Sequence, residues 1–186
     1  MQKLVAIGTR LAIICTVAAL VLALVNAVTA PVIAQNRQEA LNEALARIVG
    51  DAEVGERVDV PEEESEVVSG YYPVGGDGET AARYVVELIG SGYGGEMQIL
   101  AGIHSDGEIF SAVLMQNNET PGLGKEAENP GYMEGKFVGR GSDQPIPTTK
   151  SDLPPAEAEA VSGSTITFMG IADALKTGSE FVKERL

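Results

Sequence analysis

Residues 97–115, MQILAGIHSDGEIFSAVLM, contain the pattern that decides the fold. Two apolar runs, 97–103 and 109–115, predict β-strands, and Ser105–Asp106–Gly107 between them is typical of a hairpin turn. A further strand is predicted upstream at 84–89, YVVELI, because β-branched and apolar residues dominate it. Successive strands with short connections indicate an antiparallel sheet.

Helices are predicted at the edges of this sheet region. A short helical piece is expected at 134–138, and a longer helix at 166–175 ends near Gly178. The segment 145–155 contains four prolines and is predicted to be a loop. Strands grouped first, with helices around them, predict an α+β fold in which helices flank an antiparallel sheet.

The N-terminal region has a different composition. Residues 11–36 contain no charged side chain, and a helix of that length spans roughly 39 Å, more than the hydrocarbon core of a bilayer. Lys3 and Arg10 precede it, so the positive-inside rule predicts a cytoplasmic segment at 1–10 and a transmembrane helix at 11–35. The rest of the chain is then extracytoplasmic.

A cleaved signal peptide is the alternative interpretation of this region. The small residues of Val28–Thr29–Ala30 suit a peptidase, but Pro31 would follow the cut directly. The apolar stretch is also longer than the 7–15 residues of a typical signal-peptide core. These observations favour an uncleaved anchor.

Charge is distributed unevenly between the two parts of the chain. The formal net charge is −14, and residues 37–186 contain all 27 acidic residues but only 11 of the 13 basic ones. Such acidity argues against a nucleic-acid partner. One cysteine and one histidine exclude an internal disulfide and a Cys/His zinc cage. We expect a helical stalk and acidic linker at 36–66 and a single extracytoplasmic domain at 67–186.

Two segments have residue types suited to binding. Residues 119–125, ETPGLGK, follow a predicted strand, and a proline with two glycines there indicates a shaped loop with exposed N–H groups. Residues 159–167, EAVSGSTIT, lead into the C-terminal helix. Taken alone, the first is equally a tight turn and the second a helix N-cap. A helix N-terminus is also an anion site, which suits a phosphate.

Together these motifs resemble the FMN-binding domain of the G subunit of the Rnf electron-transport complex, a relative of the C subunit of the sodium-translocating NADH:quinone reductase. The residues that carry the resemblance are Leu24–Pro31, Gly92–Gly95, Asp106–Ile109, Glu119–Gly124 and Ser162–Thr165. The string ETPGLG followed about forty residues later by SGST, with an N-terminal anchor, is the specific part.

The resemblance implies a covalent flavin. In this family a flavin transferase esterifies the FMN phosphate to the last threonine of a motif approximating D-x-x-[ST]-G-A-T, which corresponds to Thr165. Glu159 replaces the leading Asp and Ser164 replaces the Ala, changes that keep charge or size. Asn117 stands where a His is often found, which alters the surroundings of the flavin. Further FMN contacts are implied for Ser162, Gly163, Ser164, Glu119, Thr120, Leu123 and Gly124.

The functional expectation follows from this resemblance. The chain is expected to carry electrons in a bacterial or archaeal membrane complex that couples electron flow between ferredoxin and NAD to sodium or proton translocation. It would itself neither bind NAD nor pump ions, and its partners would be the other subunits, the lipid bilayer and the flavin transferase. The alternatives are the FMN subunit of the quinone reductase and an anchored extracytoplasmic interaction module without flavin.

Overall fold

The computed structural model describes residues 2–75 and 82–186, and the side chains of residues 1–6, including that of Lys3, lie outside this description. The chain divides into two compact units, Met1–Asn42 and Glu43–Leu186. Helix α1, Gln2–Val49, forms the first unit and supplies the first residues of the second.

Helix α1 is continuous over 48 residues, so the helix predicted at 11–35 extends without a break through the polar stretch that ends at Val49. Within the first unit, the apolar side chains of α1 from Ile7 to Ile33 are exposed on all sides of the helix. It is the one helix of the described residues that is long and apolar enough to cross a membrane. Pro31 lies inside this helix, and membrane helices tolerate an internal proline.

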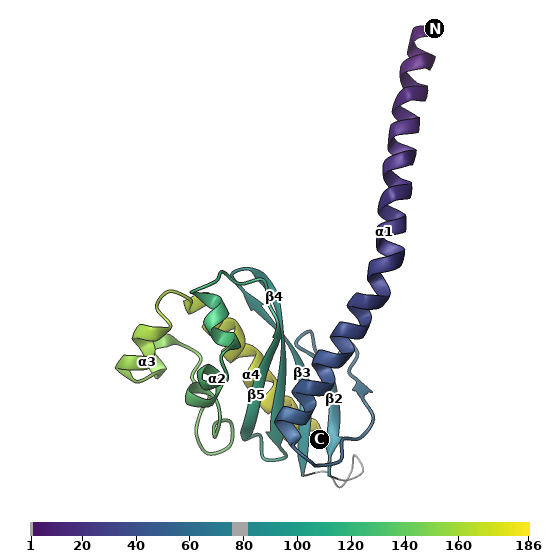
Figure 1. The fold of residues 1–186 in the computed structure, drawn as a ribbon. Helices are drawn as coiled ribbons and strands as arrows, with labels where there is room; N and C mark the ends of the chain where they lie inside the picture. The colour runs from purple at the N-terminus through teal and green to yellow at the C-terminus, as the bar shows by residue number, and fades with distance from the viewer. Residues whose placement is uncertain (1, 76–81) are drawn as a thin grey trace. The chain divides into compact units, whose positions relative to one another are not determined.

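The second unit is built on a five-stranded antiparallel sheet whose strand order follows the sequence (Figure 1). The strands are β1 Val58–Asp59, β2 Val68–Val74, β3 Arg83–Gly92, β4 Gly95–His104 and β5 Ile109–Gln116. The predicted hairpin is confirmed as β4 and β5, with Ala101 opposite Ala112. The α+β fold class is likewise confirmed, because helices flank this sheet.

Strand β2 and the two-residue β1 were not predicted. Strand β2 contains Gly70 and Pro73, and both residue types weaken a strand signal. Pro73 is tolerated because β1 pairs only with Tyr71 and Gly70, so no ladder bond is needed from the nitrogen of Pro73 on that side. Its carbonyl instead accepts the N–H of Gly55 at 2.8 Å.

The helical elements follow the sheet in sequence. They are the 3-10 turns η1 Gly124–Glu128 and η2 Lys150–Asp152 and the helices α2 Pro130–Lys136, α3 Pro155–Ala160 and α4 Thr165–Arg185. Helix α2 begins before the predicted 134–138 because the Asn129 side chain caps it, accepting the N–H of Gly131 at 3.1 Å. The predicted loop 145–155 contains η2.

Helix α4 corrects the prediction that the last helix ends near Gly178. It continues to Arg185, and Gly178 is buried against β3. A Cβ at Gly178 would lie 2.8 Å from Cδ2 of Leu88. The glycine therefore allows close helix–sheet packing and does not end the helix.

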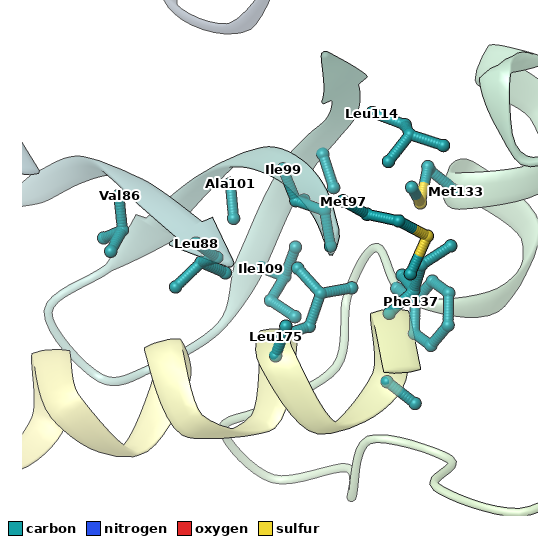
Figure 2. Packing of buried hydrophobic residues seen from close by; sticks show 14 of the residues in the cluster. Val86, Leu88, Met97, Ile99, Ala101, Ile109, Leu114, Met133, Phe137 and Leu175 are labelled. Carbon is teal, nitrogen blue, oxygen red and sulfur yellow. The ribbon is translucent and has the colours of Figure 1, made fainter. Parts of the chain in front are cut away.

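The main core lies between α4 and one face of the sheet. Alternate side chains along β3 and β4 point toward α4. Leu88 of β3 and Ile99 of β4, which are paired across the two strands, face Leu175 of α4 (Figure 2). At one end, the rings of Phe137 and Phe168 stack with centroids 5.6 Å apart. This contact fixes the N-terminal half of α4 beside α2, which is where the candidate site lies.

Candidate functional site

A cavity of about 430 Å³ lies at the N-terminus of α4, a size typical of small-molecule sites. It is lined by Tyr93, Glu119, Thr120, Leu123, Gly124, Ser162, Gly163, Ser164, Thr165, Ile166 and Thr167. All eight residues that the resemblance implied for FMN are among them. Two segments that are about forty residues apart in sequence therefore form one pocket.

Glu119 holds the pocket wall together. It is 5% exposed, and each of its carboxylate oxygens accepts one hydrogen bond from a distant segment. Oε1 accepts the N–H of Gly94 in the β3–β4 turn at 2.9 Å, and Oε2 accepts the hydroxyl of Thr167 in α4 at 2.8 Å. Because both oxygens are engaged by the protein, this side chain joins the turn, the loop and the helix.

Asn117, two residues before Glu119, also holds the loop in place. Its Oδ1 accepts the N–H of Glu119 at 3.0 Å, and its Nδ2 donates to Glu128 at 2.9 Å. It is not among the described residues that line the pocket. In this structure Asn117 thus shapes the loop and does not reach into the cavity.

Glycines give the ETPGLG loop its course. Gly122 has φ +77°, a left-handed conformation that other residues rarely adopt. A Cβ at Gly124 would lie 2.3 Å from Oε2 of Glu119, so this position needs the close approach that glycine permits. Across the pocket, a Cβ at Gly163 would lie 2.8 Å from Cδ2 of Leu123. The two segments therefore meet at Gly163 and Leu123.

The start of α4 is open. Ser164 occupies the N-cap position, but among the described residues no side chain makes a capping hydrogen bond to this helix. The expected N-cap position of the Ser/Thr segment is therefore confirmed at Ser164, but its side chain does not make the capping hydrogen bond. Thr165 is the first helical residue, and its hydroxyl donates to the carbonyl of Val161 at 3.2 Å. The first-turn N–H groups of a helix have no partner within the helix, so an uncapped end favours an anion.

Helix α2 lies beside the N-terminal end of α4. Tyr132 interacts with Ser164, and burial raises the pKa of the Tyr132 phenol to about 12 against the opposing effect of that hydroxyl. The ammonium of Lys136 lies 4.0 Å from the centre of the Tyr132 ring. Burial lowers the pKa of Lys136, and Glu157 partly offsets this effect. The charge of Lys136 faces the aromatic ring and not the cavity.

Sequence reasoning missed three residues that line the pocket. Tyr93 belongs to the GYGG turn, which was part of the resemblance but had no assigned role. Ile166 and Thr167 directly follow the SGST string. The alternation of exposed Ile166 and buried Thr167 depends on how α4 packs, which a linear motif does not reveal.

Known proteins similar to this chain match it over most of its length. Residues 92–180 match the FMN-binding domain family, and residues 5–48 match the RnfG N-terminal region. The G subunit of the Na(+)-translocating ferredoxin:NAD(+) oxidoreductase complex of Acetobacterium woodii is 33% identical over 91% of this chain and 86% of its own length. The G subunit of the proton-translocating complex of Clostridium ljungdahlii is 28% identical over 97% and 92%, respectively.

A more limited similarity extends to the quinone reductases. The C subunit of the Na(+)-translocating NADH-quinone reductase of Yersinia pestis is 32% identical, but over only 55% of this chain and 42% of its own length. The matches to the G subunits extend through both the N-terminal helix and the pocket. On this basis the chain belongs to the G-subunit family of ion-translocating oxidoreductase complexes.

Proposed function

We propose that the chain is the FMN-carrying electron-transfer subunit of an ion-translocating ferredoxin:NAD oxidoreductase. The observation that carries this proposal is the single pocket formed by the ETPGLG and SGST segments. Every residue that lines it falls within the part of the chain that matches the FMN-binding domain. Its volume of about 430 Å³ and its mixed polar and apolar lining suit a planar ring with a phosphate-bearing chain.

We propose further that FMN is esterified to Thr165. The oxygen of the Thr165 hydroxyl would form the new bond to phosphorus and lose its proton, while a flavin dinucleotide donor releases its other mononucleotide. The hydroxyl lies at the first turn of a 21-residue helix that no described side chain caps. The phosphate diester keeps one negative charge, which the positive end of the helix dipole stabilises.

The remaining pocket residues have distinct proposed roles. Leu123 is 47% exposed at the pocket and offers an apolar surface for the flavin ring. Glu119 holds the walls in place through Gly94 and Thr167, so both of its oxygens are already engaged. FMN, when bound, supplies the capacity to accept and release electrons one at a time. The chain itself then needs only to bind and orient the cofactor.

The membrane arrangement is part of the same proposal. Helix α1 anchors the chain once in the bilayer, and Lys3 and Arg10 keep the N-terminus in the cytoplasm. The second unit is then extracytoplasmic, where an ester makes retention of FMN independent of binding affinity. Its partners are the other subunits, which exchange electrons with ferredoxin and NAD and move sodium or protons, and a flavin transferase that attaches FMN.

In-gel flavin fluorescence tests covalent attachment. The full chain, co-expressed with a flavin transferase and denatured, is expected to give a fluorescent band that the Thr165→Ala variant lacks. Thr177→Ala is a matched control, because Thr177 also lies on α4 and its hydroxyl donates to the carbonyl four residues earlier, at 2.9 Å. A dark wild-type band would refute the covalent flavin, and a fluorescent Thr165→Ala band would refute the attachment site.

Labelling of intact cells tests the orientation. Asp143 is exposed in the second unit, so an Asp143→Cys variant offers a thiol to a membrane-impermeant maleimide. Labelling of intact cells is expected for this variant. The wild-type chain is the unlabelled control, because its single cysteine, Cys15, lies within α1. Labelling only after cell lysis would place the domain in the cytoplasm and overturn this part of the proposal.

A further inference from the structure

A phosphate bound in the pocket would place two negative groups, the phosphate and the Glu119 carboxylate, in the same cavity. Glu119 already contributes a buried carboxylate whose partners are an N–H and a hydroxyl. Among the described residues, no cation forms an ion pair with it. An esterified phosphate would add a second negative charge in the same cavity. The helix end supplies the equivalent of about half a positive charge, which is less than the two groups together require.

The lysines that neighbour the pocket differ in how far they are available. Lys125 follows the ETPGLG loop, but its ammonium pairs with Glu128 at 3.5 Å. Lys136 is buried over the Tyr132 ring and does not line the cavity among the described residues. Lys150 is likewise not among the described residues that line the cavity, but it is exposed, and its ammonium donates a hydrogen bond to the hydroxyl of Ser162, a residue of the pocket wall.

An ammonium has three N–H donors, and the bond to Ser162 uses one of those of Lys150, so two others can donate at this position. The Ser162 hydroxyl donates its own proton to the carbonyl of Ala158 at 3.1 Å, so it accepts from Lys150 through a lone pair. Ser162 is neutral and does not offset the lysine charge. Within residues 2–75 and 82–186, no carboxylate forms an ion pair with Lys150. Lys150 is therefore a cation without an ion-pair partner among the described residues. It contacts the pocket wall at Ser162, which is three residues before Thr165.

The backbone that carries Lys150 is held in place. One oxygen of Asp152 accepts the N–H of Thr148 at 3.1 Å, the N–H of Thr149 at 2.8 Å and the Thr149 hydroxyl at 3.0 Å. The hydrogen bonds from Thr149, the N-cap residue of η2, lower the pKa of Asp152, the last residue of this turn. Leu153 directly after it is buried in the core. Lys150 thus extends from a braced turn, and only its own side chain needs ordering on binding.

We propose that Lys150 binds the phosphate of FMN and holds it against the hydroxyl of Thr165, before and after the ester forms. This proposal rests on the function proposed above and adds a residue to the same site. Ser162 positions the contact, because its hydroxyl already orients the ammonium. Charge strengthens this hydrogen bond and the exposure of Lys150 to solvent weakens it, so we expect a net contribution of about five- to tenfold in binding or rate.

The first measurement is the rate of covalent FMN incorporation into the full chain by a flavin transferase. Lys150→Met is expected to slow it about five- to tenfold, and Lys150→Arg, which keeps the charge, is expected to stay within about twofold of wild type. Lys125→Met is the matched control and is expected to leave the rate unchanged. An unchanged rate for Lys150→Met with a labelled wild type overturns this inference alone, whereas an unlabelled wild type overturns the proposed function.

The second measurement separates phosphate binding from recognition by the transferase. After incorporation has gone to completion, the ³¹P resonance of the diester reports on the phosphate directly. Lys150→Met is expected to shift this resonance from the wild-type position, and Lys125→Met to leave it in place. A slower rate with an unshifted resonance would mean that Lys150 serves the transferase, and it would overturn the assignment.

Discussion

Two carboxylates of the second unit, Glu87 and Glu119, are satisfied in different ways. Glu87 on β3 accepts from the guanidinium of Arg57 at 2.7 Å and from the hydroxyl of Tyr72 at 2.8 Å. Glu119 accepts only from the neutral Gly94 N–H and Thr167 hydroxyl among the described residues. The first therefore has a counter-charge and the second does not.

The difference indicates what each carboxylate contributes. The ion pair of Glu87 ties β3 to the chain before β1 and acts as a structural clamp. Glu119 lies in a pocket wall and joins three segments of the candidate site. A carboxylate satisfied by neutral groups leaves a net charge in the pocket, which affects any anion bound there.

The largest expected effect comes from removing Glu119. Glu119→Ala leaves the Gly94 N–H and the Thr167 hydroxyl without acceptors and opens a cavity, so we expect a loss of about 3 kcal/mol in the free energy of unfolding. Urea unfolding of the full chain in detergent, followed by tyrosine fluorescence, measures it. Exposed Glu126→Ala is the control. A loss below about 1 kcal/mol would show that Glu119 does not hold the walls together.

Removing the charge of Glu87 is expected to have a smaller effect. Glu87→Gln keeps the shape but weakens the pairing with Arg57, whose side chain is 35% exposed, so we expect about 1.5 kcal/mol of destabilisation. The same unfolding measurement applies. Combining it with Arg57→Met in a double-mutant cycle isolates the pair, and additive effects of the two substitutions would contradict a coupled clamp.

The stability that Glu87 contributes should depend on pH. Burial raises its pKa, but hydrogen bonds from Arg57 and Tyr72 outweigh this and hold it below the ordinary value of 4.5. The folded state therefore binds fewer protons than the unfolded state, and the contribution is present above pH 4.5 and lost as the pH falls through the folded pKa. The stability difference between wild type and Glu87→Gln should narrow between about pH 6 and about pH 3. A constant difference would refute this.

The smallest expected effect concerns an exposed pair. Lys125 and Glu128 lie 3.5 Å apart with side chains 42% and 48% exposed. Lys125→Met should change the free energy of unfolding by less than about 0.5 kcal/mol, because solvent screens surface pairs. This result would sharpen the comparison, since it separates a cation in an exposed surface pair from Arg57, which compensates the partly buried carboxylate of Glu87. A loss comparable to that of Glu87→Gln would contradict it.

The parts of the fold that followed from sequence are those with strong local patterns. The uncharged N-terminal stretch predicted the long helix, and the apolar runs around Ser105–Gly107 predicted the β4–β5 hairpin. Strand β2 and the length of α4 were not predictable in this way. Pro73 and Gly178 signal breaks locally, yet tertiary packing against Gly55 and Leu88 gives each a place inside a regular element.

The candidate site was also predicted in part from sequence and in part only from tertiary contacts. The residue types of ETPGLG and SGST, with the resemblance they carry, were enough to identify eight of the pocket residues. Sequence by itself also established the apolar anchor and the acidity of the remainder, because both depend on composition. Only the tertiary structure decided that Glu119 joins three segments, that the Ser164 side chain makes no capping hydrogen bond to α4, and that Lys150 contacts Ser162. These contacts join residues up to 48 positions apart, and such distances depend on how the sheet and helix pack.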